Sequence, residues 1–203
     1  MPSPSTVRRV IKPIVFLVCL LPLAGLAIAA FGIGGASLGA DPVAHLLHEL
    51  GEWALRLLVA TLAITPLRWI FGQPWLIALR RMLGLFAFTY VLLHFLVWLV
   101  LDQGLYWGGI LADIAKRPFI TIGFAAFVLL IPLAVTSTNK MMRRLGKNWQ
   151  KLHKLIYVIV PLGVWHYYWL VKKDVTEPLI YAGITAFLLG YRYWRARRKR
   201  QAA

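Results

Sequence analysis

Six apolar segments, each close to the length that crosses a lipid bilayer, constrain the fold of this chain most strongly. A helix needs roughly 20 mostly apolar residues to span the hydrocarbon core. The segments cover approximately residues 12–31, 44–65, 82–101, 119–136, 154–171 and 178–194. Hydrophobic residues make up 60% of the 203 residues, which is more than a soluble domain of this size can bury. We therefore expect an all-α integral membrane protein, a six-helix transmembrane bundle that forms a single domain over residues 1–203.

Basic residues flank these segments unevenly. If successive segments alternate in direction, the side that holds the N-terminus carries eighteen Lys and Arg residues and the other side carries four. The eighteen are Arg8, Arg9, Lys12, Arg68, Arg80, Arg81, Lys140, Arg143, Arg144, Lys147, Lys151, Lys154, Arg192, Arg195, Arg197, Arg198, Lys199 and Arg200. The four are Lys116, Arg117, Lys172 and Lys173. Because positively charged loops stay in the cytoplasm, we expect both termini there, with the basic residues contacting membrane lipids and no nucleic acid as a partner.

Three histidines lie within or beside the apolar segments, where an ionisable side chain is costly and marks a candidate functional site. His94 comes thirteen residues after Arg81 in the third segment, and His166 comes thirteen residues after His153 in the fifth. At 1.5 Å per residue, His94 and His166 both lie roughly 20 Å into a core about 30 Å thick. The two segments run in the same direction, so we expect these side chains to meet at one depth, nearer the outer surface.

Two imidazoles that meet from neighbouring helices suit the two axial positions of a haem iron. Each neutral ring binds iron through one nitrogen, while a carbonyl or hydroxyl group fixes its second nitrogen. We therefore expect one haem b between His94 and His166, in a site that favours electron transfer. Interhelical hydrogen bonding and a proton relay in a transporter are the alternatives for these residues.

His153 lies lower, next to the cytoplasmic interface, where it is either a further haem ligand or an interfacial histidine. Thirteen residues of ideal helix turn through about 1300°, which leaves His153 and His166 roughly 140° apart around the axis. One straight helix does not aim both rings at the same partner. Pro161 and Gly163 lie between them and can kink or rephase the helix.

A second polar cluster begins the second segment on its outer side. His48, Glu52 and Arg56 follow one another at four-residue spacing and share one face of a helix. An ion pair beside an interfacial histidine is one interpretation of the cluster. The other interpretations are a quinone pocket or partner-docking site at His48 and Glu52, and a clamp for a haem propionate at Arg56.

Several motifs, taken in order, resemble one known family. They are Leu38-Gly39-Ala40-Asp41-Pro42, Ile64-Thr65-Pro66-Leu67, Arg80-Arg81 with Leu83-Gly84-Leu85 and His94, Thr136-Ser137-Thr138, Arg143 with Leu145-Gly146-Lys147, Trp149 and Leu152-His153, and Pro178-Leu179-Ile180-Tyr181-Ala182-Gly183. Over nearly the whole chain they are similar to the MsrQ family, formerly YedZ, the haem-binding membrane subunits of the bacterial periplasmic methionine sulfoxide reductase system. More distantly, the chain resembles the transmembrane domain of ferric reductases and NADPH oxidases.

The resemblance implies a multi-pass protein of the bacterial inner membrane that takes electrons from quinol. Such a protein passes them through haem b to a periplasmic, molybdopterin-containing subunit that reduces oxidised methionines. The chain would then be an electron-transfer subunit and not the catalytic one. FMN is also associated with the family. The family's haem histidines fall on His94, His153 and His166.

One departure from the oxidase relatives leaves the number of cofactors open. Those relatives use four histidines for two stacked haems, whereas here Arg80 and Arg81 stand at the level of His153 in the third segment. Either arginine can pair with a propionate or a flavin phosphate through two hydrogen bonds. The alternative function is a ferric or flavin-linked reductase of the NADPH-oxidase type, fed by a separate cytoplasmic flavin reductase.

Overall fold

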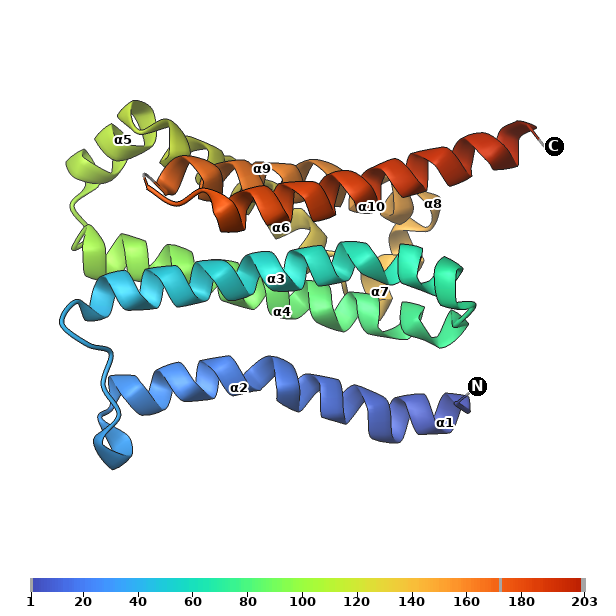
Figure 1. Ribbon diagram of the computed structural model, residues 1–203, viewed down its shortest axis with the longest axis horizontal. Coiled ribbons are helices and arrows are strands. Elements are labelled where there is room, and N and C mark those ends of the chain that lie inside the picture. The colour runs from blue at the N-terminus through green and yellow to red at the C-terminus, as the bar shows by residue number, and fades with distance from the viewer. Residues whose placement is uncertain (1, 172, 202–203) are drawn as a thin grey trace.

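The computed structural model describes residues 2–171 and 173–201, which form helices joined by turns and contain no β-strand. The predicted all-α class is confirmed. Lys172, one of the four basic residues expected on the outer side, lies outside the described residues. The long helices run side by side, and α1 lies at the same end of the bundle as the last turns of α10 (Figure 1).

The N-terminal helix lies at the edge of the bundle. α1 (Pro4–Thr6), the π-helical η1 (Val7–Ile11) and α2 (Lys12–Ala30) follow one another without a break. Most of the apolar side chains on α2 are exposed, as lipid-facing residues are. The buried Tyr90 hydroxyl donates a hydrogen bond of 2.8 Å to the Cys19 carbonyl and so ties α2 to its neighbour.

α3 (Pro42–Phe71) is longer than the sequence predicted. The Asp41 carboxylate caps its first turn by accepting a hydrogen bond from a backbone amide. Gly72 follows its last residue with a φ of 62°, in the left-handed region that favours glycine. The sequence predicted a segment of approximately residues 44–65 that stops before Pro66, because proline removes a helical hydrogen bond, but the helix continues to Phe71.

α3 continues past Pro66 because another side chain replaces the lost bond. Pro66 has no N–H to offer the Leu62 carbonyl four residues earlier. The Arg192 guanidinium, on α10 (Thr176–Gln201), donates to that carbonyl over 2.6 Å and to the Tyr157 hydroxyl over 3.0 Å. A buried carbonyl without a partner costs about 1–3 kcal/mol. The contact therefore stabilises α3 at its proline and holds α10 against it.

The next helix packs closely along α3. It consists of η3 (Pro74–Leu76), α4 (Ile77–Leu96) and the π-helical η4 (Val97–Asp102), which follow one another directly. It therefore begins before the predicted residue 82. A turn then leads into α5 (Trp107–Lys116), a short helix at the end of the bundle opposite to α1 (Figure 1).

α6 (Pro118–Val135) and α9 (Ile156–Leu170) form the second closely packed pair. Between them come α7 (Asn139–Leu145), α8 (Lys147–Leu152) and the 3-10 turn η5 (His153–Leu155). The α3–α4 and α6–α9 pairs share one apolar core. Its fully buried members include Leu62, Tyr90, Ile159 and Val160.

Among the described residues, four helices are long and apolar enough to cross a membrane. They are Pro4–Ala30, Pro42–Phe71, Pro74–Asp102 and Pro118–Val135. The last two segments of the sequence prediction are also helical, but α9 has 15 residues and α10 ends in a strongly basic stretch. The chain is therefore a helical membrane protein.

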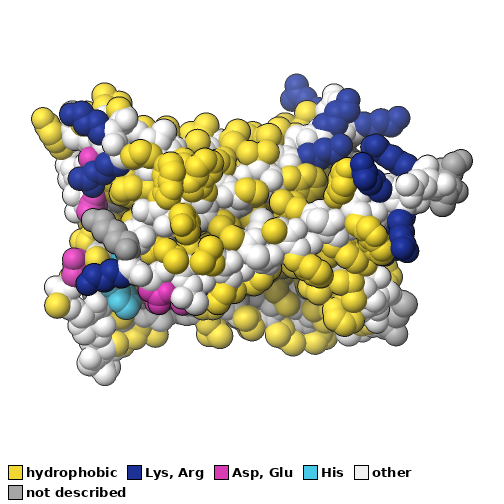
Figure 2. Space-filling model, turned by 45° about the horizontal axis from the view of Figure 1, so that its top comes forward, with side chains coloured by type: hydrophobic (Ala, Val, Ile, Leu, Met, Phe, Trp, Pro, Cys, Tyr) yellow, Lys and Arg dark blue, Asp and Glu magenta, His cyan; other side chains and the backbone are white. Residues whose placement is uncertain are grey.

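Charged side chains gather at the two ends of the bundle and leave its middle apolar. Figure 2 shows most of the visible Lys and Arg side chains at the end that holds the last turns of α10, with the visible acidic side chains at the opposite end. Hydrophobic side chains cover the surface between them. This distribution is typical of a bundle that lies across a membrane, with its basic end on one side.

Candidate functional site

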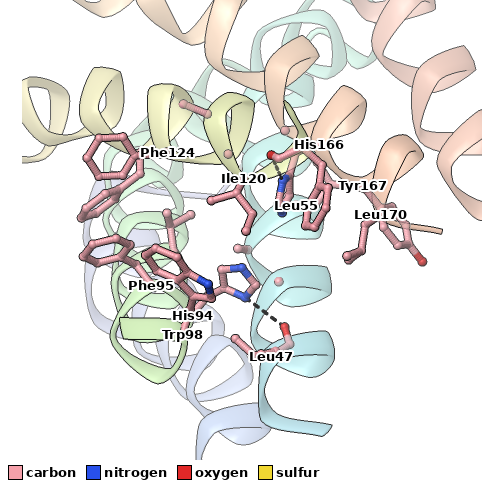
Figure 3. Close-up of a pocket in the computed structure, with 18 of the residues that line it drawn as sticks. Leu47, Leu55, His94, Phe95, Trp98, Ile120, Phe124, His166, Tyr167 and Leu170 are labelled. Atoms are coloured by element: carbon pink, nitrogen blue, oxygen red, sulfur yellow. Dashed lines mark hydrogen bonds between the residues drawn. The ribbon is translucent and has the colours of Figure 1, made fainter. Parts of the chain in front are cut away.

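A cavity of about 350 Å³ lies between α3, α4, α6 and α9. Its walls are mostly aliphatic and aromatic, and they include Leu55, Phe95, Trp98, Phe124 and Leu170 (Figure 3). Charged and titratable side chains join the lining near the starts of α3 and α6 and near the end of η4. They are His48, Glu52, Asp102 and Arg117. The cavity is therefore apolar inside and polar toward the end of the bundle that carries α5.

His94 on α4 and His166 on α9 both project into this cavity (Figure 3). The Nδ1 atom of His94 lies 2.9 Å from the Leu47 carbonyl oxygen, and that of His166 lies 2.7 Å from the Phe119 carbonyl oxygen. Because a carbonyl can only accept, each Nδ1 carries a proton, and in the neutral ring Nε2 is then the unprotonated nitrogen. This is the tautomer in which a neutral imidazole binds a metal through Nε2.

The spacing of the two rings fits a single metal ion between them. Their centroids are 6.2 Å apart and their planes meet at 84°. Two metal–nitrogen bonds of about 2 Å, with about 1 Å from each nitrogen to its ring centre, add up to about 6 Å. Among the described residues, no group of three or more His, Cys, Asp or Glu is arranged to hold a metal alone. The donor set therefore suits an iron that brings its own equatorial ligands, as haem iron does.

A glycine opposite each histidine makes room for its ring. A Cβ atom on Gly51 of α3 would lie 3.2 Å from the Nδ1 and Cε1 atoms of His94. A Cβ atom on Gly123 of α6 would lie only 2.7 Å from the Nδ1 atom of His166. Protein interiors do not accommodate contacts this short without displacing a neighbour. The two glycines therefore let each histidine reach the backbone carbonyl that orients it.

The two halves of the site repeat each other along the chain. Each half supplies a carbonyl, a glycine four residues later and a histidine 43 residues after the glycine. The matching pairs are Leu47 and Phe119, Gly51 and Gly123, and His94 and His166, and the members of each pair are 72 positions apart. Sequence reasoning found the histidines and missed the carbonyls and the glycines. The repeated glycine-to-histidine spacing was the signal that could have found them.

His153 is not among the residues that line this cavity. Its Nδ1 atom donates to the Trp149 carbonyl over 3.0 Å, its ring stacks on the Trp149 indole, and its Nε2 atom lies 3.5 Å from the Ser137 hydroxyl. Burial, and to a lesser extent the charge of Arg80, lowers the pKa of His153 below its ordinary value. The ring is therefore neutral at pH 7.

The sequence allowed a kink or a change of helix phase at Pro161 or Gly163, between His153 and His166. α9 continues through Pro161 and Gly163 as one helix. The regular α-helix is interrupted instead at η5, the 3-10 turn that begins at His153. A 3-10 turn has three residues per turn, so it rotates the residues before it relative to those after it.

Arg80 and Arg81 lie with His153 at the basic end of the bundle, away from the cavity. The Arg81 guanidinium donates to the Asn139 side chain and to the Met142 sulfur, and so ties α4 to α7. Arg81 also lines a groove between α2 and α4, together with Lys12. Arg81 lies 72 positions before His153, the same spacing that separates His94 from His166, so Arg81 occupies the equivalent position in the first half of the site.

The ion pair predicted on the first turns of α3 is present. The Arg56 Nη2 atom lies 2.6 Å from a Glu52 carboxylate oxygen, and its Nε atom donates to the Tyr181 hydroxyl over 3.3 Å. The guanidinium also lies over the Trp53 ring. Glu52 and His48 line the cavity, whereas Arg56 is not among its lining residues.

Comparison with known proteins gives one consistent family. The family model described as "Ferric reductase like transmembrane component" matches residues 50–164. A relative from Xanthomonas axonopodis pv. citri is 50% identical over 99% of this chain and 94% of its own length. A relative from Xanthomonas campestris pv. campestris is 57% identical over 80% and 74%, and one from Ralstonia nicotianae is 50% identical over 94% and 88%. All three are named protein-methionine-sulfoxide reductase heme-binding subunit MsrQ. No solved structure matches the chain significantly.

The helical membrane bundle, with its paired histidines on α4 and α9, is thus of the ferric reductase-like transmembrane class. The family match begins within α3 and ends within α9, so it includes His94, while His166 lies two residues beyond it. Within that class, the chain belongs to the MsrQ family. The family suggested by the sequence motifs is confirmed.

Proposed function

We propose that this chain is a membrane cytochrome b that transfers electrons across the bacterial inner membrane to a periplasmic methionine sulfoxide reductase subunit. The observation that carries the proposal is the His94–His166 pair, with both Nδ1 atoms hydrogen-bonded to carbonyls and the ring centroids 6.2 Å apart in an apolar cavity. The names of the relatives, which describe a heme-binding subunit of such a reductase, support it.

In this proposal His94 and His166 would hold one haem b through their Nε2 atoms. The bound haem supplies a one-electron carrier. The residues of this chain hold it and set its surroundings: the Leu47 and Phe119 carbonyls fix the two ring orientations, and the aliphatic and aromatic walls exclude water. With both histidines bound to it, the haem would favour electron transfer over reaction with a bound substrate. Reduction of methionine sulfoxide is then left to the partner, a molybdopterin-containing subunit.

A second cofactor, if the chain holds one, belongs at the basic end. His153 lies there with Arg80 and Arg81, three residues that can serve a second haem or the phosphate of FMN. Arg56, the other arginine proposed for a propionate, is already engaged by Glu52 and Tyr181. His48 and Glu52 line the cavity near its polar end and are the candidates for a quinone or partner site.

The topology that we propose has six spans, with α9 and α10 as the fifth and sixth and residues 1–203 as one domain. α9 has 15 residues, but it packs against α6 and α10, and the segment from His153 to Leu170 reaches the basic end. Both termini are cytoplasmic in this arrangement, because the end that holds them carries most of the Lys and Arg side chains visible in Figure 2. Electrons would then enter from quinol and leave at the end that carries α5.

The test is a spectrum followed by a transfer assay on the full chain. We expect the purified protein to have a low-spin haem spectrum that changes on dithionite reduction, and His94→Ala and His166→Ala to lose it. In proteoliposomes, a quinol should reduce the wild-type haem, and a purified partner subunit should reoxidise it. Reduction only by NADH with a flavin reductase would favour the ferric or flavin-linked reductase instead. A colourless protein would contradict both functions and favour a proton relay.

A further inference from the structure

We propose that Arg117 binds a propionate carboxylate of the haem and sets the orientation of the haem in the cavity, an inference that rests on the proposed function. Of the described residues that line the cavity, Arg117 is the one Lys or Arg. It directly precedes α6 and is two residues before Phe119, whose carbonyl holds His166. The backbone that orients one axial histidine thus also carries the cation that we assign to the propionate.

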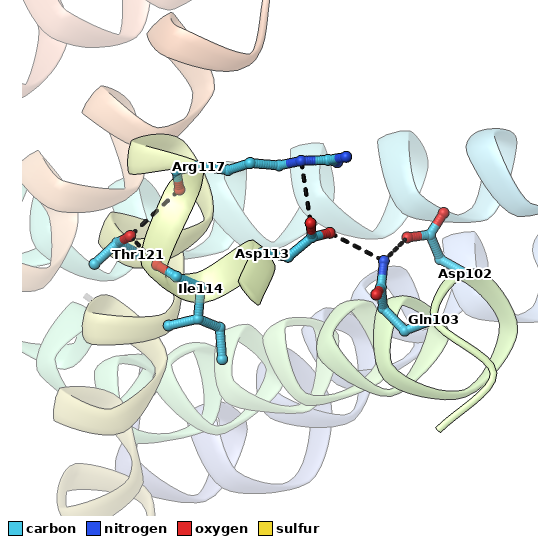
Figure 4. Close-up of polar contacts among 6 residues, drawn as sticks. All are labelled: Asp102, Gln103, Asp113, Ile114, Arg117 and Thr121. Atoms are coloured by element: carbon cyan, nitrogen blue, oxygen red, sulfur yellow. Dashed lines mark hydrogen bonds and ion pairs between the residues drawn. The ribbon is translucent and has the colours of Figure 1, made fainter. Parts of the chain in front are cut away.

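The Arg117 side chain is more than half exposed, is paired with one acidic residue and still has hydrogen-bond donors to offer. Its Nε atom lies 3.2 Å from one carboxylate oxygen of Asp113 on α5. The other oxygen of Asp113 accepts a hydrogen bond from the Gln103 side chain, which also donates to Asp102 (Figure 4). Asp113 therefore engages only the Nε side of the guanidinium. Within the described part of the chain, its two terminal amino groups have no recorded acceptor. They form a planar fork that matches a carboxylate.

The polarity of the cavity favours propionates that point toward Arg117. The deeper lining residues are apolar and include Leu58, Val91, Leu130 and Ile159, so a carboxylate placed there would be desolvated without a partner. The charged lining residues gather at the other end, where Glu52 is already paired with Arg56. Within the described part of the chain, Arg117 is thus the lining cation available to a carboxylate at that end.

The ion pair of Arg117 with Asp113 also suggests a purely structural role, in which it joins α5 to α6. The two roles predict different responses of the haem. A cation beside the propionates disfavours the more positive ferric state, so its loss should lower the midpoint potential. Loss of Asp113 removes a negative charge from the same surroundings and should leave the potential unchanged or higher.

The experiment compares four variants of the full haem-loaded chain: Arg117→Gln, Arg117→Lys, Asp113→Asn and Lys116→Gln. Lys116 is the adjacent exposed cation and does not line the cavity, so Lys116→Gln is the matched control. The readouts are the low-spin spectrum, the midpoint potential from a redox titration, and the rate of haem transfer to excess apomyoglobin.

We expect Arg117→Gln to keep the low-spin spectrum, to lower the midpoint potential and to release haem about tenfold faster, the factor that corresponds to a loss of 1.4 kcal/mol. Arg117→Lys should have a midpoint potential close to that of the wild type. It should still release haem faster than the wild type, because an ammonium lacks the planar pair of N–H donors that binds both carboxylate oxygens. The inference would be overturned if Arg117→Gln had the same midpoint potential and haem-release rate as Lys116→Gln. It would also be overturned if Asp113→Asn lowered the midpoint potential as much as Arg117→Gln does. Failure of the wild type to bind haem at all would instead overturn the proposed function.

Discussion

His94 and His166 are 72 positions apart, and each is hydrogen-bonded to the backbone carbonyl 47 residues before it. The α3–α4 and α6–α9 pairs therefore present their imidazoles in the same way, one from each side of the cavity. The equivalence explains how two rings from different helices come to lie at one level with matching tautomers. It also places the determinants of the site on α3 and α6, which carry neither histidine.

The first prediction concerns the glycine opposite His166. In Gly123→Ala, the new methyl group would lie 2.7 Å from His166 Nδ1, so the ring or α6 must move. Alanine is otherwise favoured over glycine in a helix, so any loss reflects this contact. With an overpacking cost of about 1–3 kcal/mol, haem affinity should fall by about 5-fold to 150-fold. The measurement is haem content per chain in purified protein, by absorbance.

Gly163→Ala is the matched control for that prediction. Gly163 also lines the cavity, but a Cβ atom there would meet Leu55 at 3.6 Å, an ordinary contact. Gly51→Ala should have an intermediate effect, since its contacts with His94 are 3.2 Å. Equal haem content in Gly123→Ala and Gly163→Ala would show that the ring is not confined as the structure indicates.

The second prediction concerns the Leu62 carbonyl, which Pro66 leaves without its helical partner. Arg192→Gln removes the guanidinium that donates to this carbonyl over 2.6 Å. We expect the free energy of unfolding to fall by about 1–3 kcal/mol, the cost of a buried unpaired carbonyl. The measurement is denaturation of the purified protein in mixed micelles.

A double-mutant cycle isolates this contact from the other effects of losing Arg192. In a Pro66→Ala background, residue 66 has an N–H for Leu62, so Arg192→Gln should cost less than in the wild type. Arg195→Gln, which removes a surface cation lying over the Trp69 ring, should cost little in either background. An identical cost of Arg192→Gln in both backgrounds would argue against the carbonyl as the reason for its effect.

Much of this architecture could be predicted from the sequence, because apolar length and basic flanks are local signals. The continuation of α3 past Pro66 could not be predicted, since it depends on Arg192, more than 120 residues away. Propensity alone predicts a break at proline, and a tertiary hydrogen bond overrides it. The start of α4 before residue 82 was missed for a simpler reason, because hydropathy locates the middle of a span better than its ends.

The histidines of the candidate site could be predicted from the sequence, but the carbonyls and glycines that position them could not. Depth counting put His94 and His166 at one level, since helical rise fixes depth along parallel segments. Which carbonyl and which glycine each ring meets depends on how α3 and α6 pack, which hydropathy does not encode. Arg117 appeared in the sequence only as one of four basic residues on the outer side. Its neighbours in the cavity come from three other helices.

The third prediction concerns orientation. Cys19 is buried, and a Cys19→Ala background provides a chain without cysteine. Single cysteines are then introduced at Ser37, in the exposed turn before α3, and at Gln201, at the end of α10. An impermeant maleimide added to intact spheroplasts should label Ser37→Cys and leave Gln201→Cys unlabelled until the cells are broken. Labelling of Gln201→Cys in intact spheroplasts would contradict cytoplasmic termini.

The most direct test of the central claim is the haem-to-protein ratio, measured by pyridine haemochrome on the wild type and three alanine variants. If His94 and His166 are the two axial ligands of one haem, His94→Ala and His166→Ala should each lose that haem. His153→Ala should keep it, because His153 does not line the cavity. Full haem occupancy in both His94→Ala and His166→Ala would contradict the account.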